Sequence, residues 1–221
     1  MFGWLFNKPS YRRFEDSYAL NRSGLMQGLK ESIDWKSGPD QITFLVAHFP
    51  NVFSDLQLTL ENWETPYEVV AQTVNRQWLE QRQTGVNLPV FLTMAELFET
   101  DMPDIEPWQN SPEVSIMVAE RHPLEIHDQR IENFGRRLRR PVEIGYFLAL
   151  DDEIINQFIS PGMIHLLRQL GLREQELITS HMVTRKLNQA TRKLNKQILQ
   201  EQPADSAADW FQLNSVSQGL Q

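Results

Sequence analysis

Residues 118–140, VAERHPLEIHDQRIENFGRRLRR, contain the side chains best suited to chemistry. The triplet Glu120-Arg121-His122 follows a short apolar run, and His127 and Asp128 come soon after it. Imidazole and carboxylate groups bind metals such as zinc. An arginine-rich segment follows. The segment is therefore either a catalytic site or the frame of one.

The metal hypothesis depends on His122 and His127, which are five positions apart, with Asp128 beside them. No third ligand is spaced along the sequence to complete the site, so we predict no metal and a structural role for His122. The chain has no cysteine, which excludes disulfides, thiolate zinc sites and cysteine nucleophiles.

Other chemical signals are weaker. Ser54, Ser111 and Ser180 lack a G-x-S-x-G elbow, which argues against a serine hydrolase. The six acids from Glu96 to Glu113 lack the EF-hand pattern and predict a solvated loop. The acids at 151–153 sit where a helix should begin, so we expect them to cap it.

Nucleotide-binding signals are missing as well. No G-x-x-x-x-G-K-[ST] loop occurs anywhere in the sequence, so the backbone cradle, the lysine and the magnesium-binding hydroxyl of a P-loop are absent. We therefore expect no cofactor and no catalytic residue of that kind.

Composition sets the class of protein. The 221 residues are 41% hydrophobic, enough for one core with an appendage. No apolar run is long enough to span a bilayer, and MFGWLF lacks the features of a secretory signal, so we expect a cytoplasmic protein. Net charge is -9 over residues 1–120 and +4 over 121–200. We interpret the basic half as a solvated face or a match to the acidic half, and do not expect nucleic-acid binding.

Hydrophobic patterns predict the elements that position these side chains. The β-rich runs at 42–47, 88–93, 114–119 and 144–149 predict strands, and 67–70 predicts a brief one. Helical stretches separate them, including a first helix that carries Phe14, Tyr18, Leu25 and Leu29, a second capped by Ser54, and others at 72–83 and 127–138. This alternation predicts an α/β fold with a mainly parallel sheet and helices on both faces.

The sequence changes character after the last strand. We predict one α/β domain over 1–150, C-terminal helices packed on it over 151–202, and a flexible tail over 203–221. Within the helices, the stretch 176–200 carries a long apolar stripe, which needs a surface to pack against.

The segment from about 114 to 195 resembles the end of the second motor domain of SecA, the preprotein translocase ATPase. That family has a strand entering GTERH, an arginine-finger segment like RIDNQLRGRSGRQGDPG, a strand like RFYLSL, and the acids EDD. The counterparts here are VAERH, HDQRIENFGRRLRRP, GYFLAL and DDE. The later stretches RQLG and HMVTRKLNQATRKLN resemble the family's following helices. The resemblance implies a RecA-like fold for the α/β domain.

Departures from the family pattern remove most of the chemistry. Phe134 and Glu132 stand where the family has arginines, and of the finger arginines only Arg137 remains. Loss of an arginine finger can cost orders of magnitude in rate. Glu120, Arg121, His122 and Arg137 are thus predicted to be vestigial motif positions, in a protein that is not an enzyme.

The resemblance implies a non-catalytic, SecA-related binding or regulatory module with a protein partner, such as a translocase component. Two alternatives stay open. One is a nucleotide-sensing or trans-acting half of an ATPase, completed by a partner subunit that receives Arg137. The other is an interaction module unrelated to secretion.

Two groups of residues are candidates for contact with partners. Phe2, Trp4 and Phe6 at the N-terminus would pack on the domain or make peripheral contact with a membrane. Arg136, Arg137, Arg139 and Arg140 form a cationic cluster that would meet an acidic partner.

Overall fold

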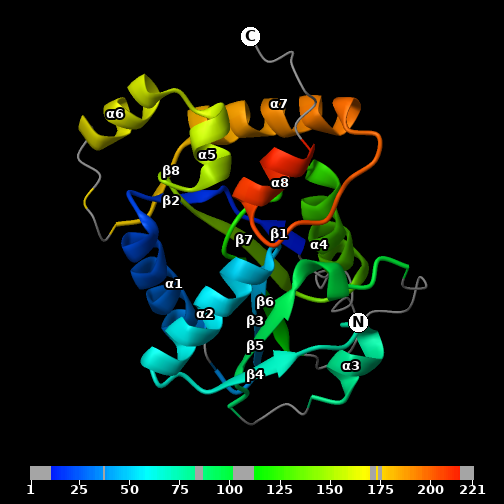
Figure 1. Ribbon diagram of the computed structural model, residues 1–221. Helices are drawn as coiled ribbons and strands as arrows, with labels where there is room; N and C mark the ends of the chain where they lie inside the picture. Colours follow the sequence, from blue (N-terminus) through cyan, green and yellow to red (C-terminus); the bar gives the residue numbers. More distant parts are fainter. Residues whose placement is uncertain are drawn as a thin grey trace, which may run out of the picture.

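The computed structural model describes residues 11–36, 38–82, 87–101, 112–169, 173 and 176–214, shown in Figure 1. One eight-stranded sheet runs through it, in the order β4-β5-β3-β6-β7-β2-β8, with β1 also paired to β7. The strands are β1 (Tyr11–Arg13), β2 (Ser17–Ala19), β3 (Gln41–Ala47), β4 (Tyr67–Val70), β5 (Val90–Met94), β6 (Glu113–Val118), β7 (Val142–Ala149) and β8 (Ile178–Thr179). All pairings are parallel except that of β8 with β2.

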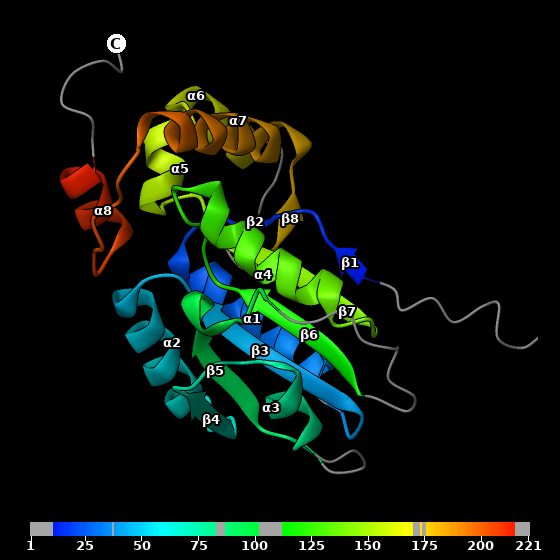
Figure 2. The same ribbon diagram turned by 90° about the vertical axis from the view of Figure 1, so that its right-hand side faces the viewer.

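Helices cover both faces of the sheet, as Figures 1 and 2 show. On one face α1 (Arg22–Lys36) and α2 (Pro50–Asn62) share a buried cluster with alternate strand residues such as Leu45, Leu92 and Met117. On the other face α3 (Arg76–Glu80) and α4 (Glu125–Arg137) pack with Phe44 and Ile116. A short 3-10 turn, η1 (Ala95–Leu97), follows β5.

The C-terminal helices lie above one end of the sheet (Figure 1). They are α5 (Glu153–Phe158), α6 (Pro161–Gln169), α7 (His181–Gln197) and α8 (Ala207–Asn214). Val183 and Leu187 of α7 are fully buried and belong to the same cluster as the strand residue Val118. The apolar stripe predicted over 176–200 therefore packs against the α/β domain.

The structure confirms the predicted fold class, an α/β domain with a mainly parallel sheet, helices on both faces and additional C-terminal helices. The four main strands lie within two residues of their predicted limits. Their central positions are almost fully buried on both faces, which is why each reads as a continuous apolar run.

Three local predictions are wrong. The first helix begins at Arg22 and contains neither Phe14 nor Tyr18. Tyr18 lies in β2 and Phe14 lies just before β2, and the backbone of both pairs with β7. Ser54 does not cap α2, which starts a turn earlier at Pro50. The tail is ordered as far as Asn214, because α8 buries Trp210 to 1% exposure.

A core substitution in α7 tests whether these helices and the sheet unfold together. Leu187→Ala should lower the free energy of unfolding by about 2–5 kcal/mol, because it leaves a cavity in the shared cluster. Met182→Ala, on the same helix but 45% exposed, should change it by less than about 0.5 kcal/mol. Urea denaturation followed by both circular dichroism and tryptophan fluorescence measures this. Two separate transitions would contradict the shared core.

Candidate functional site

The candidate site lies at the carboxyl ends of β3 and β6. These two strands are neighbours, but the chain leaves β3 into α2 on one face and leaves β6 toward α4 on the other. In open α/β sheets, ligands bind in the crevice that such diverging connections create. The triplet Glu120-Arg121-His122 directly follows β6 and therefore lines this crevice, as does His48 after β3.

Glu120 joins the two sides of the crevice. Its Oε1 accepts hydrogen bonds from the backbone N–H groups of His48, at 2.8 Å, and Phe49, at 3.0 Å. The side chain is almost completely buried, and this burial raises the pKa of Glu120 to about 8, although the two N–H groups act in the opposite direction. Glu120 thus fixes the start of α2 against the end of β6.

Arg121 is the centre of a buried ionic network. Its guanidinium lies 2.5 Å from Oδ2 of Asp128 on α4 and 2.8 Å from Oδ2 of Asp16, which precedes β2. It also donates to Oδ1 of Asn188 on α7 at 3.1 Å. The cation holds the pKa of Asp128 well below its usual range despite the burial of that carboxyl. One side chain therefore links the sheet edge, α4 and α7.

The same carboxylates bind further partners. His48 Nε2 lies 2.9 Å from Oδ1 of Asp128, and Arg13 contacts Asp16 at 2.5 Å. The guanidinium of Arg121 also lies over the ring of Tyr146, with its central carbon 4.9 Å from the ring centre. Each carboxylate is thus occupied inside the protein, which indicates a structural role.

His122 faces the crevice but is held by its neighbours. Its Nδ1 accepts a hydrogen bond from the N–H of Leu124 at 3.0 Å, which leaves the ring proton on Nε2. Nε2 lies 3.4 Å from Oε1 of Glu201. The ring stacks on Phe49 at 5.1 Å and meets the edge of Trp210 at 5.7 Å. Burial lowers the pKa of His122 well below its ordinary value, so the ring is neutral at physiological pH.

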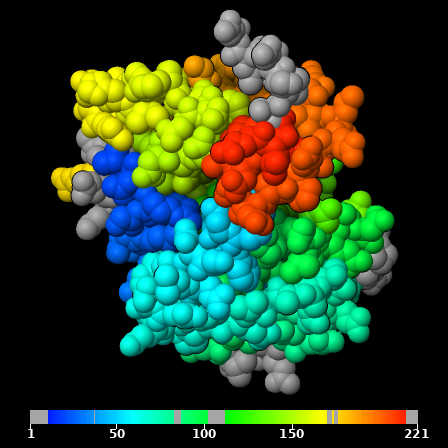
Figure 3. All heavy atoms as spheres, in the orientation of Figure 1, coloured from blue at the N-terminus to red at the C-terminus, as the bar shows by residue number. Residues whose placement is uncertain are grey.

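The segment 198–214 covers the crevice; we call it the C-terminal cover. In Figure 3 its helix α8, in red, lies against α5 and the start of α2. Trp210 packs with Phe49 and Leu124, and its Nε1 donates to Oε1 of Glu201 at 2.6 Å. His127 Nε2 lies 2.7 Å from the other oxygen of Glu201.

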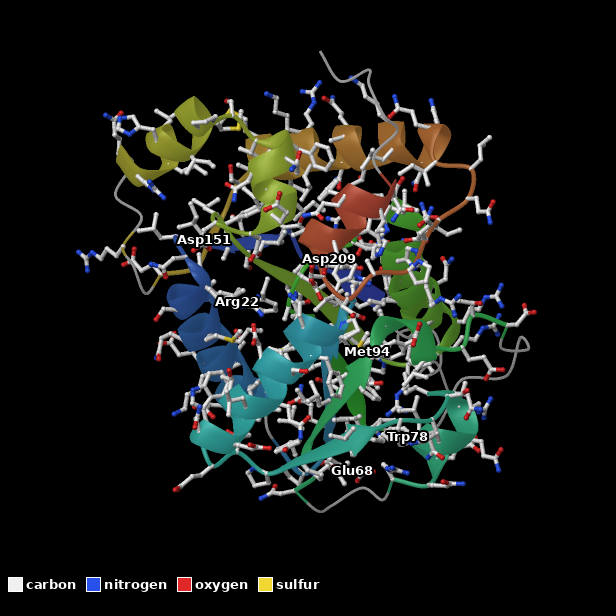
Figure 4. The ribbon with its side chains drawn as sticks, viewed as in Figure 1. Arg22, Glu68, Trp78, Met94, Asp151 and Asp209 are labelled. Atoms are coloured by element: carbon white, nitrogen blue, oxygen red, sulfur yellow. The ribbon has the colours of Figure 1, made fainter. Side chains whose placement is uncertain are left out.

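Three hydrogen bonds close the cover, two made by the side-chain amide of Asn214 and one between backbone groups. Asn214 accepts from the N–H of Gln202 at 2.7 Å and donates to its carbonyl at 2.8 Å, and Asn51 at the start of α2 donates to the carbonyl of Asp205 at 3.1 Å. A cavity of about 640 Å³ remains beside the cover, bordered by Met94 and Asp209, both labelled in Figure 4. The cover therefore narrows the crevice but leaves a cavity lined by His48, His122, His127 and Glu201.

The structure corrects the expectation that no third metal ligand is available. His122, His127 and Glu201 place potential ligand atoms within 4.8 Å of one another. Sequence reasoning missed Glu201 because it lies 74 positions from His127. The hydrogen bonds of these side chains nevertheless explain their positions without a metal, since His122 Nε2 carries a proton and both Glu201 oxygens accept from donors. The arrangement is best described as a clamp that holds the cover.

The arginines after Phe134 do not reach the crevice. Gly135 lies against Val142 and Ile144, so the last turn of α4 is at the amino end of β7, about 18 Å along the helix from its start. Arg137 lies there, 3.7 Å from Asp101. The structure therefore separates Arg137 from the other vestigial positions.

The predicted cationic cluster is smaller than expected. Arg140 is only 1% exposed and donates to the carbonyl of Pro112, and burial lowers its pKa to about 10. It is a structural residue, so its prediction as a partner contact is wrong. Arg136 pairs with Glu132 at 2.7 Å and Arg139 adopts a positive φ of 48°, and both are exposed. Phe2, Trp4 and Phe6 lie outside the described residues.

Phe134 and Glu132, which stand where the SecA family has arginines, have structural roles. Phe134 is fully buried and packs on Phe98, with ring centres 4.7 Å apart. Glu132 pairs with Arg13 and Arg136.

The acids at 151–153 do not cap α5 with their side chains as predicted. Asp152 is the N-cap residue of α5, but its Oδ2 accepts from the N–H of Ala149 at 2.7 Å and makes no capping bond. Burial raises the pKa of Asp152 to about 6.

Comparison with known proteins finds similarity to SecA. The chain is 32% identical over 79 residues to the protein translocase subunit SecA of Campylobacter hominis and of Rickettsia akari, and 30% identical to that of Dichelobacter nodosus. Each match covers 36% of this chain and 9% of the relative. No family model matches. The predicted similarity to SecA is thus confirmed for about a third of the chain.

A solved structure is similar in part. The C-terminal part of the Fun30 ATPase domain matches with a TM-score of 0.42 and 14% identity, over 79% of this chain and 55% of that one. Among the described residues, no helix is both long and apolar enough to cross a membrane.

The ionic network predicts a large stability loss for Arg121→Met. The buried Asp128 would lose its main countercharge and Asp16 one of its two, the other being Arg13, which should cost about 3–5 kcal/mol in the free energy of unfolding. Arg136→Met removes a half-exposed pair within α4 and should cost less than about 1 kcal/mol. Chemical denaturation of both variants measures the difference. Equal losses would show that the network does not stabilise the fold.

Glu120 predicts a pH dependence of stability. Its pKa is raised in the folded state, so its contribution is present in full below its unfolded pKa of about 4.3 and is lost as pH rises toward about 8. Glu120→Gln keeps an oxygen for the two N–H groups but cannot ionise. Its stability relative to the unchanged protein should therefore increase from pH 5 to pH 8. Glu80→Gln, with a side chain 44% exposed, should show no such trend in the same denaturation series.

Proposed function

We propose that this chain is a non-catalytic, SecA-related module that acts by binding a protein partner. The observation that carries the proposal is the C-terminal cover: Trp210 and Glu201 occupy part of the crevice where an α/β sheet of this topology would bind a ligand. The cavity that remains beside them has no lysine or arginine among its described lining residues, so a triphosphate that entered it would find no cation.

The electrostatics support the same conclusion. Arg121, the cation at the end of β6, is already shared between Asp16 and Asp128, and the carboxylates of Glu96, Glu201, Asp205 and Asp209 line the remaining cavity. A triphosphate would meet acidic groups and no glycine-rich loop with a lysine. Arg137 lies at the far end of α4, which removes support for a finger acting at this site.

The partial similarity to SecA motivates the partner. The named relatives are subunits of a protein translocase, and the matched stretch is about a tenth of their length. We infer that the chain, predicted to reside in the cytoplasm, binds a component of the translocation machinery and modulates it without turnover of its own. Affinity capture of the full chain from its native cells tests this inference, and enrichment of translocase components is the expected result. Their absence would favour a module unrelated to secretion.

The chain should neither bind ATP at micromolar concentration nor hydrolyse it. Titration calorimetry with ATP and magnesium at physiological salt, together with a phosphate-release assay, measures both. Trp210→Ala opens the cover and should leave both results unchanged, because the phosphate-binding groups are missing and not merely hidden. Leu213→Ala, on the same helix but 49% exposed, is the matched control. A saturable site in Trp210→Ala alone would identify a nucleotide sensor closed by its own helix.

A further inference from the structure

A second hollow lies beside β7, on the face of the sheet that α1 covers and away from the crevice. Its volume is about 790 Å³, and its walls are α1 on one side and the residues around β8 on the other. Ser115 of β6 and Gly145 of β7 form part of its floor. We call this hollow the α1 groove.

The groove exists because glycines line it at places where larger side chains would fill the space between α1 and the sheet. Gly145 has no side chain to fill the floor, and a Cβ there would lie 3.1 Å from the ring of Phe147. Gly28 of α1 lets Leu177 approach so closely that a Cβ at position 28 would lie 2.5 Å from it. Leu177 therefore seats the β8 wall on α1 and leaves the neighbouring space open.

Aromatic side chains dominate the apolar part of the groove. Phe14 and Phe147 lie along it, and Trp35 at the end of α1 is 84% exposed. An indole is costly to leave in water, and exposed aromatic residues beside a hollow are typical of protein interaction sites. Leu58 of α2 is also exposed, at 58%, but does not line this groove.

Carboxylates surround this aromatic floor. Glu15, Glu31, Glu143 and Glu176 come from four separate parts of the chain, whereas Lys36 is the one lysine or arginine among the lining residues that the structure describes. Lys36 pairs with Glu143, Glu15 pairs with His181 at 2.7 Å, and Glu176 lies 3.7 Å from Arg173, an exposed residue that does not line the groove. The lining therefore carries a net negative charge spread around an apolar centre.

From this charge pattern we propose that the α1 groove binds a short peptide segment of a partner protein that combines apolar side chains with several lysines or arginines. A ligand with one cation would meet one of the carboxylates, whereas a segment with several can meet those on both walls while its apolar residues contact Trp35 and Phe147. Opposite charge would also increase the association rate. The proposal deepens the proposed binding role and rests on it.

The test uses the full chain and a fluorescently labelled synthetic peptide of about eight residues, leucine and phenylalanine alternating with lysine, which spans up to about 27 Å when extended. Fluorescence anisotropy should show saturable binding that weakens as salt rises. A matched peptide with glutamate in place of each lysine should bind at least about tenfold more weakly.

Variants locate the site. Glu31→Lys combined with Glu176→Lys, and separately Trp35→Ala, should each weaken binding about tenfold or more. Asp34→Lys, exposed on α1 but outside the groove, and Leu58→Ala should bind as the unchanged chain does. Equal binding by all variants, or by the glutamate peptide, would overturn the proposal.

A truncated variant tests the other possible occupant of the groove, the chain's own N-terminal segment. If the peptide binds only after residues 1–8 are removed, the groove serves the chain's own N-terminal segment, and the partner-peptide proposal fails. The peptide measurements do not involve ATP, so a failure to bind peptide would not decide whether the chain is non-catalytic; the calorimetry with ATP decides that. Conversely, a nucleotide site detected by calorimetry would not change the result of the peptide measurements.

Discussion

The fold depends on one buried cation. Arg121 stands where β6 ends, and its guanidinium meets Asp16 before β2, Asp128 on α4 and Asn188 on α7. These groups come from four parts of the chain that span 172 positions. Without Arg121, Asp128 would lose its main countercharge, Asp16 would keep only Arg13, and Asn188 would lose the donor to its Oδ1. The sheet edge, the crossover helix and the C-terminal helices are therefore tied together by a single contact set. The charge of Arg121 is thus neutralised inside the protein.

The C-terminal cover follows from that arrangement. Because Arg121 orients α4, His127 on its first turn faces Glu201, and His122 is left between Phe49 and Trp210. Glu120 holds the opposite wall by its bonds to His48 and Phe49. The triplet after β6 thus has three separate tasks, one for each residue: joining strands, neutralising carboxylates and supporting the cover. Each of the three side chains therefore has a structural contact of its own.

Sequence patterns predicted the parts of the fold that local burial determines. The central strands are buried on both faces, so their apolar runs mark them directly, and α4 shows the expected helical spacing. The segment 14–19 was misread because Phe14, Tyr18 and Leu25 also fit a helix, whereas pairing with β7, more than 120 positions away, decides its conformation. Glu201, Trp210 and the burial of Arg140 could not be predicted for the same reason. Their partners are set by tertiary contacts that no local periodicity records.

The position of the cover in the sequence has a consequence for biogenesis. A ribosome completes β7 65 residues before it completes α8, which at usual rates takes about 3 to 13 seconds. During that interval the sheet can assemble while Phe49, Leu124 and His122 still lack the indole that later shields them. The nascent chain therefore passes through a stage with an uncovered apolar crevice, when chaperones have access that the finished protein denies them.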